Sequence, residues 1–384
     1  MPTRKIKVGV IASTTTGYNA MKTFYEQIIQ PDINIYMAKL PYRRFNPRHE
    51  FEFIIKDAEG SAVRHLELVE EFHDDGVDLV IGGGWSSQAA GSLNYVNNKG
   101  MLLFSYSSTA PVLAIPNDNL YRMCTDDLKQ GAAIAEMLHS KGKKSVIVFQ
   151  RDDAWGNGLF NVIKNEYEAK GGKILERIVY PPDTVDFTDY LQTAENKAVA
   201  ATVNEKPIAI ELISFSEAVN IILGAQNYPT IYDLEWFGSD GTAFTEELLE
   251  QAPAQSVKLK IYSTICAPDH SSKYEEMAAR YNAVLGQYFS YYSACQVDVA
   301  WVIALAVLEA KPSGGPPLKA TNVIKVIPDV ASRYYGYSGW CLLNEAGDRY
   351  TSNYEIWGCG MVNGEPGFVY YGMYNSTTGT ITWE

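Results

Sequence analysis

Cysteine is scarce in this chain of 384 residues, and the absence of any CxxC pair argues against a zinc site. We expect all the cysteines to be buried free thiols that pack as small apolar groups, with a Cys341–Cys359 pair as the alternative if the fold brings these two together. The five are Cys124, Cys266, Cys295, Cys341 and Cys359. Long apolar runs are missing too. The longest, residues 297–308, contains Asp298 and predicts a buried helix rather than a membrane span.

Positively charged residues are fewer than negatively charged ones. Lysine and arginine number 32 against 45 aspartates and glutamates, which gives a net charge of −13. Because contacts to phosphate need clustered cations, we expect no nucleic-acid partner. The sequence shows no signal peptide at its start, so we expect either a cytoplasmic protein or one whose leader was removed and replaced by a starting methionine.

The motifs of common enzyme classes are absent as well. Residues 12–18, after the first predicted strand, lack the GxGxxG pattern, and neither GxxxxGK[ST] nor HExxH occurs. Residues 84–88 begin like a GxSxG nucleophile elbow but end in Gln88 instead of glycine. The five histidines fall in charged or helical stretches, where we expect surface or helix positions. We therefore predict that the protein is not an enzyme and needs no cofactor; a hydrolase with Ser86 as nucleophile is the alternative.

What the sequence does contain, in two successive regions, is an alternation of short apolar strands with helix-length amphipathic segments. This order predicts an α/β protein with two doubly wound parallel-sheet lobes. The predicted strands are residues 5–12, 51–57, 77–83 and 101–105 in the first region, and 144–149, 173–179, 208–213 and 235–238 in the second, followed by 258–264. Beyond residue 333, turn signals at 344–348 and 362–365 predict hairpins.

Two loops of the first region are candidates for holding an anion. In residues 82–88, three glycines allow backbone N–H groups to approach a ligand, and Ser86 and Ser87 lie near a predicted helix start. The alternative is that these serines only cap the helix. In residues 105–111, four hydroxyl side chains within five positions form a neutral cradle suited to a carboxylate or a polar amide. The alternative there is a Ser/Thr turn ended by Pro111.

The second region supplies acidic and aromatic groups in residues 150–156 and 238–241, which also follow predicted strands. Asp240 is the candidate for holding a cation, with Trp155 adding an aromatic face. Asp152 and Asp153 have helix capping or a solvated loop as their alternative. Ligands of open α/β sheets bind beyond the carboxyl ends of the strands. Hydroxyl groups from one lobe and an acid from the other would therefore suit a zwitterion.

In their order along nearly the whole chain, these loops resemble the type I periplasmic binding proteins, specifically the leucine/isoleucine/valine-binding family of ABC-transporter receptors. The segments that carry the resemblance are residues 78–87, 105–111, 120–126, 130–132, 152–158, 180–187 and 236–241. The family fold implies three hinge crossings, near Cys124, Val257 and Arg333. Lobe one would then be residues 1–124 plus 257–332 and lobe two 125–256 plus 333–384, with the ligand cleft between them.

Residue by residue, the resemblance implies a ligand carboxylate bound by the hydroxyl of Ser86, the main chain of Ser107, and the hydroxyl and main chain of Thr109. It implies an aromatic wall of Tyr18 and Trp155, with Tyr106 also facing the cleft. Asp240 would hold an ammonium group; the family often has Glu at this place, so the shorter side chain leaves ligand size open. No metal ligand is implied. The family's usual disulfide has no counterpart, because Trp85 takes one of the expected cysteine positions.

The function that the resemblance implies is an extracytoplasmic solute-binding receptor, which binds an amino acid or similar small carboxylate by cleft closure. Its expected partners are that small molecule and the membrane permease of an ABC transporter. Its expected location is the periplasmic or extracellular face of the membrane. The alternative within the fold is a sensor or receptor for short amides, urea or aromatic acids, which would be cytoplasmic if it acts as a sensor.

Overall fold

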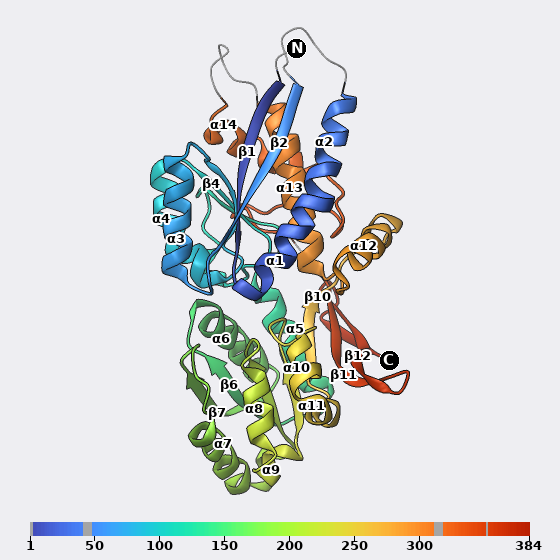
Figure 1. Cartoon of the computed structure of the whole chain (residues 1–384). Helices are drawn as coiled ribbons and strands as arrows, with labels where there is room; N and C mark the ends of the chain where they lie inside the picture. Colours follow the sequence, from blue (N-terminus) through green and yellow to red (C-terminus); the bar gives the residue numbers. More distant parts are fainter. Residues whose placement is uncertain (1–2, 41–47, 311–317, 351) are drawn as a thin grey trace. The chain divides into compact units, whose positions relative to one another are not determined.

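The computed structural model describes residues 3–40, 48–310, 318–350 and 352–384, and the chain forms two compact units. Unit 1 comprises Met1–Asp126 and Pro268–Tyr350, and unit 2 comprises Asp127–Ala267 and Thr351–Glu384. The chain therefore passes three times from one unit to the other, as predicted. Figure 1 shows each unit as a sheet covered by helices.

Unit 1 is built on a five-stranded parallel sheet with the order β2-β1-β3-β4-β5. The strands are β1 (Thr3–Ala12), β2 (Arg48–Asp57), β3 (Leu79–Ile81), β4 (Leu102–Ser105) and β5 (Leu120–Arg122). Residues 79–81 and 102–105 are wholly buried, as expected of central strands with helices on both faces. The predicted strands of the first region are confirmed, with β3 shorter than expected.

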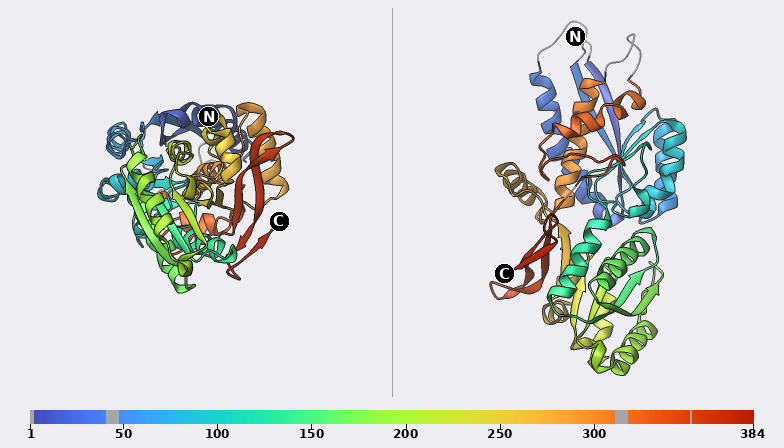
Figure 2. Two further views of the ribbon diagram at one scale, coloured as in Figure 1. Left: turned by 90° about the horizontal axis from the view of Figure 1, so that it is seen from below. Right: turned by 180° about the vertical axis from the view of Figure 1, so that it is seen from behind.

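Helices cover both faces of this sheet. In Figures 1 and 2, α3 (Ala62–Asp74) and α4 (Ser86–Lys99) lie together on one side, and α2 (Gln30–Lys39) and α13 (Tyr291–Glu309) lie on the other. α3 shows why the sequence folds this way: Ser61 caps it by accepting the Arg64 N–H, and its buried side chains recur at helical spacing. The remaining helical segments of unit 1 are α1 (Thr15–Phe24), a π-helical turn (Tyr25–Ile29), a 3₁₀ turn (Pro111–Leu113), α12 (Ser272–Leu285), α14 (Ala320–Ile324) and α15 (Ile327–Ser332).

Among the described residues, α13 is the one helix long and apolar enough to cross a membrane by length and composition. Most of it is buried inside the protein. Its Asp298 is fully buried and accepts hydrogen bonds from the backbone N–H groups of Tyr337 (2.6 Å) and Ser338 (2.8 Å) and from the Ser338 hydroxyl (2.5 Å). A buried acid paired in this way belongs to a protein core, which agrees with the predicted buried helix.

Unit 2 contains an eight-stranded mixed sheet with the order β13-β12-β11-β10-β9-β8-β6-β7. Strands β6 to β10 run parallel, and the predicted C-terminal hairpin extends the sheet with antiparallel strands. The strands are β6 (Ser145–Arg151), β7 (Lys173–Tyr180), β8 (Ile208–Ile213), β9 (Glu235–Gly238), β10 (Tyr262–Cys266), β11 (Tyr354–Val362), β12 (Glu365–Asn375) and β13 (Thr380–Trp383).

Two separate apolar cores lie on the two faces of this sheet. One face packs against α5 (Asp127–Ser140) and α6 (Ala154–Ala169). The other packs against five helices: α7 (Thr188–Ala200), α8 (Ala218–Ala225), α9 (Pro229–Tyr232), α10 (Glu246–Gln251) and α11 (Pro253–Leu259). Strand β8 alternates between the two cores, since Ile210 and Leu212 face one and Ala209 and Ile213 the other.

Two of the unit boundaries differ from the prediction. The second crossing follows Ala267, not Val257, because β10 still belongs to the sheet of unit 2. The predicted strand 258–264 also begins too early: α11 runs to Leu259, and Lys260 and Ile261 have left-handed φ angles of 62° and 48° before β10 starts.

The third crossing follows Tyr350 rather than Arg333, because the segment between them is bound to unit 1. Arg122 N–H donates to the Gly347 carbonyl, and Arg349 N–H donates to the Arg122 carbonyl, both at 2.9 Å. The first crossing, after Asp126, lies close to the predicted Cys124.

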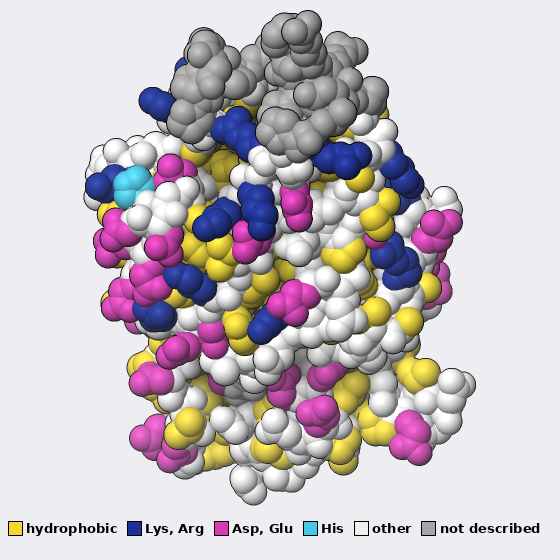
Figure 3. Space-filling model, turned by 45° about the horizontal axis from the view of Figure 1, so that its top comes forward, with side chains coloured by type: hydrophobic (Ala, Val, Ile, Leu, Met, Phe, Trp, Pro, Cys, Tyr) yellow, Lys and Arg dark blue, Asp and Glu magenta, His cyan; other side chains and the backbone are white. Residues whose placement is uncertain are grey.

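All five cysteines are buried and none forms a disulfide, so the expected buried thiols are confirmed and the Cys341–Cys359 pair is not formed. In Figure 3, lysine and arginine side chains lie on the upper part of the drawn face among aspartates and glutamates, and the lower part carries acidic side chains.

Candidate functional site

Five of the seven predicted site residues lie at one edge of the unit 1 sheet. Tyr18 follows β1, Ser86 follows β3, and Tyr106, Ser107 and Thr109 follow β4. β3 lies between β1 and β4, and all three strands are parallel. Their carboxyl ends therefore meet at the same edge, which is where open α/β sheets bind ligands.

Ser86 joins the two hydroxyl-rich loops. It is the first residue of α4, and its Oγ accepts the Ala110 N–H at 3.1 Å. The N-cap position is occupied by Trp85, so the alternative that Ser86 caps this helix is wrong. Because Oγ is an acceptor here and donates to no described residue, its proton is available to an anion.

The second loop, residues 105–111, is a Ser/Thr turn whose hydrogen bonds converge on Ser105, as the alternative for this loop predicted. The turn still leaves hydroxyl groups in the place expected for the cradle. The Ser105 hydroxyl donates to the Gly83 carbonyl (2.9 Å) and accepts the N–H groups of Ser108 (3.0 Å) and Ser107 (3.3 Å). The Ser107 hydroxyl donates to the Gly84 carbonyl at 2.9 Å. The main-chain N–H of Ser107 is thus held within the loop by a long hydrogen bond.

Thr109 differs from its neighbours. It is buried, yet within the described residues neither its N–H nor its hydroxyl makes a hydrogen bond. Thr109 Oγ1 is not among the fully buried side-chain atoms that lack a partner, so the hydroxyl is open to solvent. Two adjacent donors that no described residue uses mark a place where a ligand atom can bind. Of the predicted carboxylate binders, Thr109 has the most hydrogen-bonding capacity to spare.

The aromatic residues of unit 1 occupy different surroundings. Tyr106 is buried, and burial raises the pKa of its hydroxyl. A Cβ atom on Gly84 would lie 2.5 Å from both the Tyr106 hydroxyl and Ser13 Oγ, so any side chain there would have to displace them. Tyr18 is half-buried in the first turn of α1.

His65 was missed as part of this arrangement. From α3, its Nε2 accepts the Gly83 N–H at 2.7 Å, so Nδ1 carries the proton and donates to Ser92 Oγ at 2.7 Å. Burial lowers its pKa to about 3, which keeps the ring neutral. The signal was present in the sequence: His65 is spaced i, i+3, i+4, i+7 with the buried Leu68, Val69 and Phe72.

The two predicted residues of unit 2 lie near each other. Trp155 is buried near the start of α6 and stacks on Phe215, with ring centroids 4.5 Å apart and an interplanar angle of 9°. A Cβ on Gly241, the neighbour of Asp240, would meet both rings at 2.8 Å. The loop bearing Asp240 therefore packs directly against this aromatic pair.

Asp240 is oriented by a residue that the sequence analysis assigned no role. Its Oδ1 accepts a hydrogen bond from Gln130 Nε2 at 2.9 Å. Gln130 is buried in α5, and its amide also donates to the carbonyl (3.3 Å) and the hydroxyl (3.2 Å) of Thr264. Gln130 thus fixes the direction of the carboxylate.

Asp153 caps a helix, as its alternative predicted, and Asp152 is bound by a side chain of the same helix. Asp153 is the N-cap of α6 and accepts the Gly156 N–H at 2.8 Å. Asp152 accepts a hydrogen bond from the Asn157 side chain at 2.9 Å. Both carboxylates are therefore explained without a ligand.

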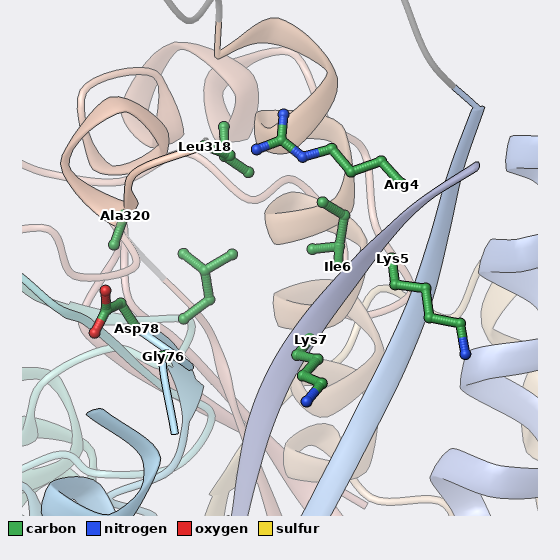
Figure 4. Close-up of a pocket in the computed structure, with 9 residues that line it drawn as sticks. Arg4, Lys5, Ile6, Lys7, Gly76, Asp78, Leu318 and Ala320 are labelled. Atoms are coloured by element: carbon green, nitrogen blue, oxygen red, sulfur yellow. The ribbon is translucent and has the colours of Figure 1, made fainter. Parts of the chain in front are cut away.

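A pocket of about 200 Å³ lies elsewhere in unit 1, at the amino ends of β1 and β3. In Figure 4 the Arg4 guanidinium reaches toward Leu318, while Asp78 lies across the pocket below Ala320. Asp78 is bound by His73 Nδ1 at 2.7 Å. None of the predicted ligand-binding residues lines this pocket.

Comparison with known proteins identifies the family. The model of the receptor family ligand binding region matches residues 41–360. The chain belongs to this receptor ligand-binding family. An uncharacterized protein of Methanocaldococcus jannaschii is 28% identical, in an alignment that covers 99% of this chain and 92% of that protein.

Solved structures place this member of the receptor ligand-binding family in the type I periplasmic binding fold. A leucine-binding protein, LivK, of Thermotoga maritima has a TM-score of 0.75 at 20% identity, covering 95% of this chain and 97% of its own. A solute-binding protein of an ABC transporter from Rhodopseudomonas palustris, solved with 3,4-dihydroxybenzoic acid, also has a TM-score of 0.75, at 16% identity and 97% and 98% coverage. The predicted type I periplasmic binding fold and the predicted α/β fold class are confirmed.

Proposed function

We propose that this chain is the solute-binding receptor of an ABC transporter and that its ligand is an amino acid or a similar small carboxylate. The observation that carries the proposal is the pair of free donors on Thr109, next to the Ser86–Ala110 contact. The Thr109 N–H, the Thr109 hydroxyl and the Ser86 hydroxyl can together donate three hydrogen bonds to a carboxylate. Such charge-assisted bonds are shorter and stronger than neutral ones.

Unit 2 supplies complementary groups in this proposal. Asp240, held by Gln130, binds the ammonium group, and Trp155 contacts the ligand side chain. A ligand that binds both units favours the closed arrangement because it interacts more strongly with that state than with the open one. The closed form then docks on the permease. In this role the protein works at the periplasmic or extracellular face of the membrane.

A thermal-shift screen over the twenty amino acids, short amides, urea and aromatic acids tests the proposal. A ligand at about 100 times its dissociation constant stabilises the folded state by about 2.7 kcal/mol. The variant Asp240→Ala should weaken amino-acid binding by more than about tenfold, the scale expected when a buried charge loses its partner.

The matched control is Asp233→Ala, which removes an exposed carboxylate paired with Lys258 at 2.9 Å and should leave affinity unchanged. If Asp240→Ala and the parent protein bound the amino acid with equal affinity, Asp240 would not bind the ligand's ammonium group. A protein that no compound in the screen stabilises would contradict the receptor function.

A receptor for aromatic acids is the second candidate, favoured by the Trp155–Phe215 stack. The dihydroxybenzoic acid bound to the R. palustris protein is a ligand of this kind. An aromatic acid without an ammonium group does not need Asp240, so its affinity should survive Asp240→Ala. A hydrolase acting through Ser86 would instead turn over amides or esters and lose that activity in Ser86→Ala.

A further inference from the structure

Arg122, at the end of β5, is fully buried and makes four guanidinium hydrogen bonds inside unit 1. Nη1 donates to the carbonyls of Ser108 (3.1 Å) and Ala110 (2.9 Å). Nε and Nη2 donate to the two carboxylate oxygens of Asp348, at 2.5 and 2.7 Å. One side chain therefore connects the hydroxyl-rich loop to a segment 226 positions away.

The bond to Ser108 determines where the neighbouring donor points. In a trans peptide, the C=O of one residue and the N–H of the next point in opposite directions. With the Ser108 carbonyl turned toward Arg122, the N–H of Thr109 is turned away from it. This is the N–H that has no partner among the described residues.

The bond to Ala110 acts on the other side of the same residue. It fixes the carbonyl of Ala110, whose N–H already donates to Ser86 Oγ at 3.1 Å. The two carbonyls that bind Arg122, those of Ser108 and Ala110, thus belong to the residues on either side of Thr109. Four of the five guanidinium N–H groups are bound inside unit 1, so the effect of Arg122 on a ligand passes through this loop.

Asp348 holds Arg122 in place from the opposite side. The backbone N–H of Asp348 donates to Asn344 Oδ1 at 3.0 Å, and the flanking residues bond to the Arg122 main chain. Burial raises the pKa of Asp348, opposed by its hydrogen bonds to Arg122. Lysine has one nitrogen and cannot bind two carbonyls and a bidentate carboxylate at once, so this geometry requires arginine.

We infer that Arg122 is a positioning residue for ligand binding: held by Asp348, it aims the Thr109 N–H and keeps the loop 107–110 in the shape that binds an anionic group. The inference rests on the proposed function and adds a determinant of its specificity. A carboxylate ligand depends on this orientation more than a ligand with a neutral amide in the same place, because charge-assisted bonds are the stronger ones.

The test measures the affinity of L-leucine and L-leucinamide by calorimetry for the parent protein, Arg122→Lys and Asp348→Asn. Both variants should bind leucine about tenfold more weakly, the effect of losing roughly one charge-assisted hydrogen bond. Leucinamide affinity should change much less. Arg333→Lys, which alters an exposed arginine paired with Glu309 and Asp329, is the matched control and should bind leucine normally.

The outcomes separate the inference from the function on which it rests. If the parent protein does not bind leucine, the leucine form of the proposed function fails and the inference falls with it. If the parent binds leucine and the folded variants bind it equally well, or lose leucine and leucinamide affinity in the same proportion, the inference alone is overturned.

A measurement on the parent protein covers the case in which both variants fail to fold. The Thr109 amide resonance should shift on addition of leucine, and its hydrogen exchange should slow, because the inference makes it a ligand donor. An unchanged Thr109 resonance in the leucine-bound protein would overturn the inference without any substitution.

Discussion

His65 Nε2 accepts the backbone N–H of Gly83 at 2.7 Å, and this contact ties α3 to the loop that follows β3. Gly83 has a left-handed φ of 62°, a conformation that suits glycine. The carbonyl of the following residue, Gly84, accepts a hydrogen bond from the Ser107 hydroxyl. The neutral His65 ring therefore fixes the loop that follows β3 by a hydrogen bond. This loop is in turn hydrogen-bonded to the hydroxyl-rich loop that follows β4.

We expect this histidine to make the protein less stable in acid. The pKa of His65 is lowered to about 3 by burial, while in the unfolded chain it is about 6.5. Between these values the unfolded state binds a proton that the folded state does not, so stability is complete above pH 6.5 and falls as the pH decreases toward 3. The loss is at most about 1.4 kcal/mol per pH unit.

Urea unfolding from pH 4 to 8 measures this effect. His65→Leu leaves the Gly83 N–H and the Ser92 hydroxyl without their partner, so it should lower stability at pH 7 by about 1–3 kcal/mol and weaken the pH dependence. His139→Gln, at an exposed position of α5, should change neither. An NMR titration that found His65 ionising near pH 6.5 would refute this account.

Replacing Gly84 or Gly91 by alanine should have opposite effects on stability. Gly84→Ala should cost about 1–3 kcal/mol and weaken ligand binding, because its Cβ would lie 2.5 Å from the Tyr106 hydroxyl and Ser13 Oγ. Gly91 lies exposed within α4, and a Cβ there meets only Ala62 at 3.6 Å. Gly91→Ala should therefore raise stability by up to about 1 kcal/mol through helix propensity.

Thermal unfolding and calorimetric titration of the two variants check the contrast. The parent protein and Gly91→Ala should bind the same ligand with the same affinity. If Gly84→Ala were as stable as the parent and bound ligand equally well, the close approach at Gly84 would have no role in shaping the site.

The sequence predicted the strands, and the loops that carry the candidate site residues, because their causes are local. Apolar runs, glycines and hydroxyl side chains lie next to one another in the chain, and parallel strands bring their carboxyl ends to one edge. The joining of Ser86 to Ala110 follows from that topology. The topology did not predict whether Ser86 caps the helix or contacts the other loop, because the same hydroxyl could do either.

The supporting residues could not be predicted in the same way. Arg122 and Asp348 meet across 226 positions, and nothing near either residue indicates the other. The third unit boundary was misplaced for the same reason, since the segment carrying Asp348 belongs to unit 1 through this contact. Polar side chains such as His65 are assigned to the surface by composition and are brought inside only by tertiary packing.

Glu211 is a buried acid of the unit 2 core with no polar partner. It lies on β8, paired in register with Val148 of β6 and Phe237 of β9. Its side chain is fully buried, and neither carboxylate oxygen makes a hydrogen bond within the described residues. Burial raises its pKa well above the usual 4.5, so the folded protein keeps it protonated in mildly acidic solution.

We expect Glu211 to lower stability as the pH rises. Above pH 4.5 the unfolded chain releases the proton that the folded state retains, so the free energy of unfolding falls with increasing pH until the raised folded pKa is passed. Glu211→Met fills a similar volume without a polar group and should stabilise the protein by about 1–3 kcal/mol at pH 7. The difference in stability between Glu211→Met and the parent protein should decrease toward pH 4.

Denaturant unfolding of the parent and Glu211→Met across pH 4 to 8 provides the measurement. Glu168→Gln, an exposed position on α6, removes the same charge from the surface and should follow the parent at every pH. A constant difference between Glu211→Met and the parent over this range would mean that Glu211 titrates alike in both states. A loss of stability in Glu211→Met would mean that the carboxyl group has a partner that stabilises the fold.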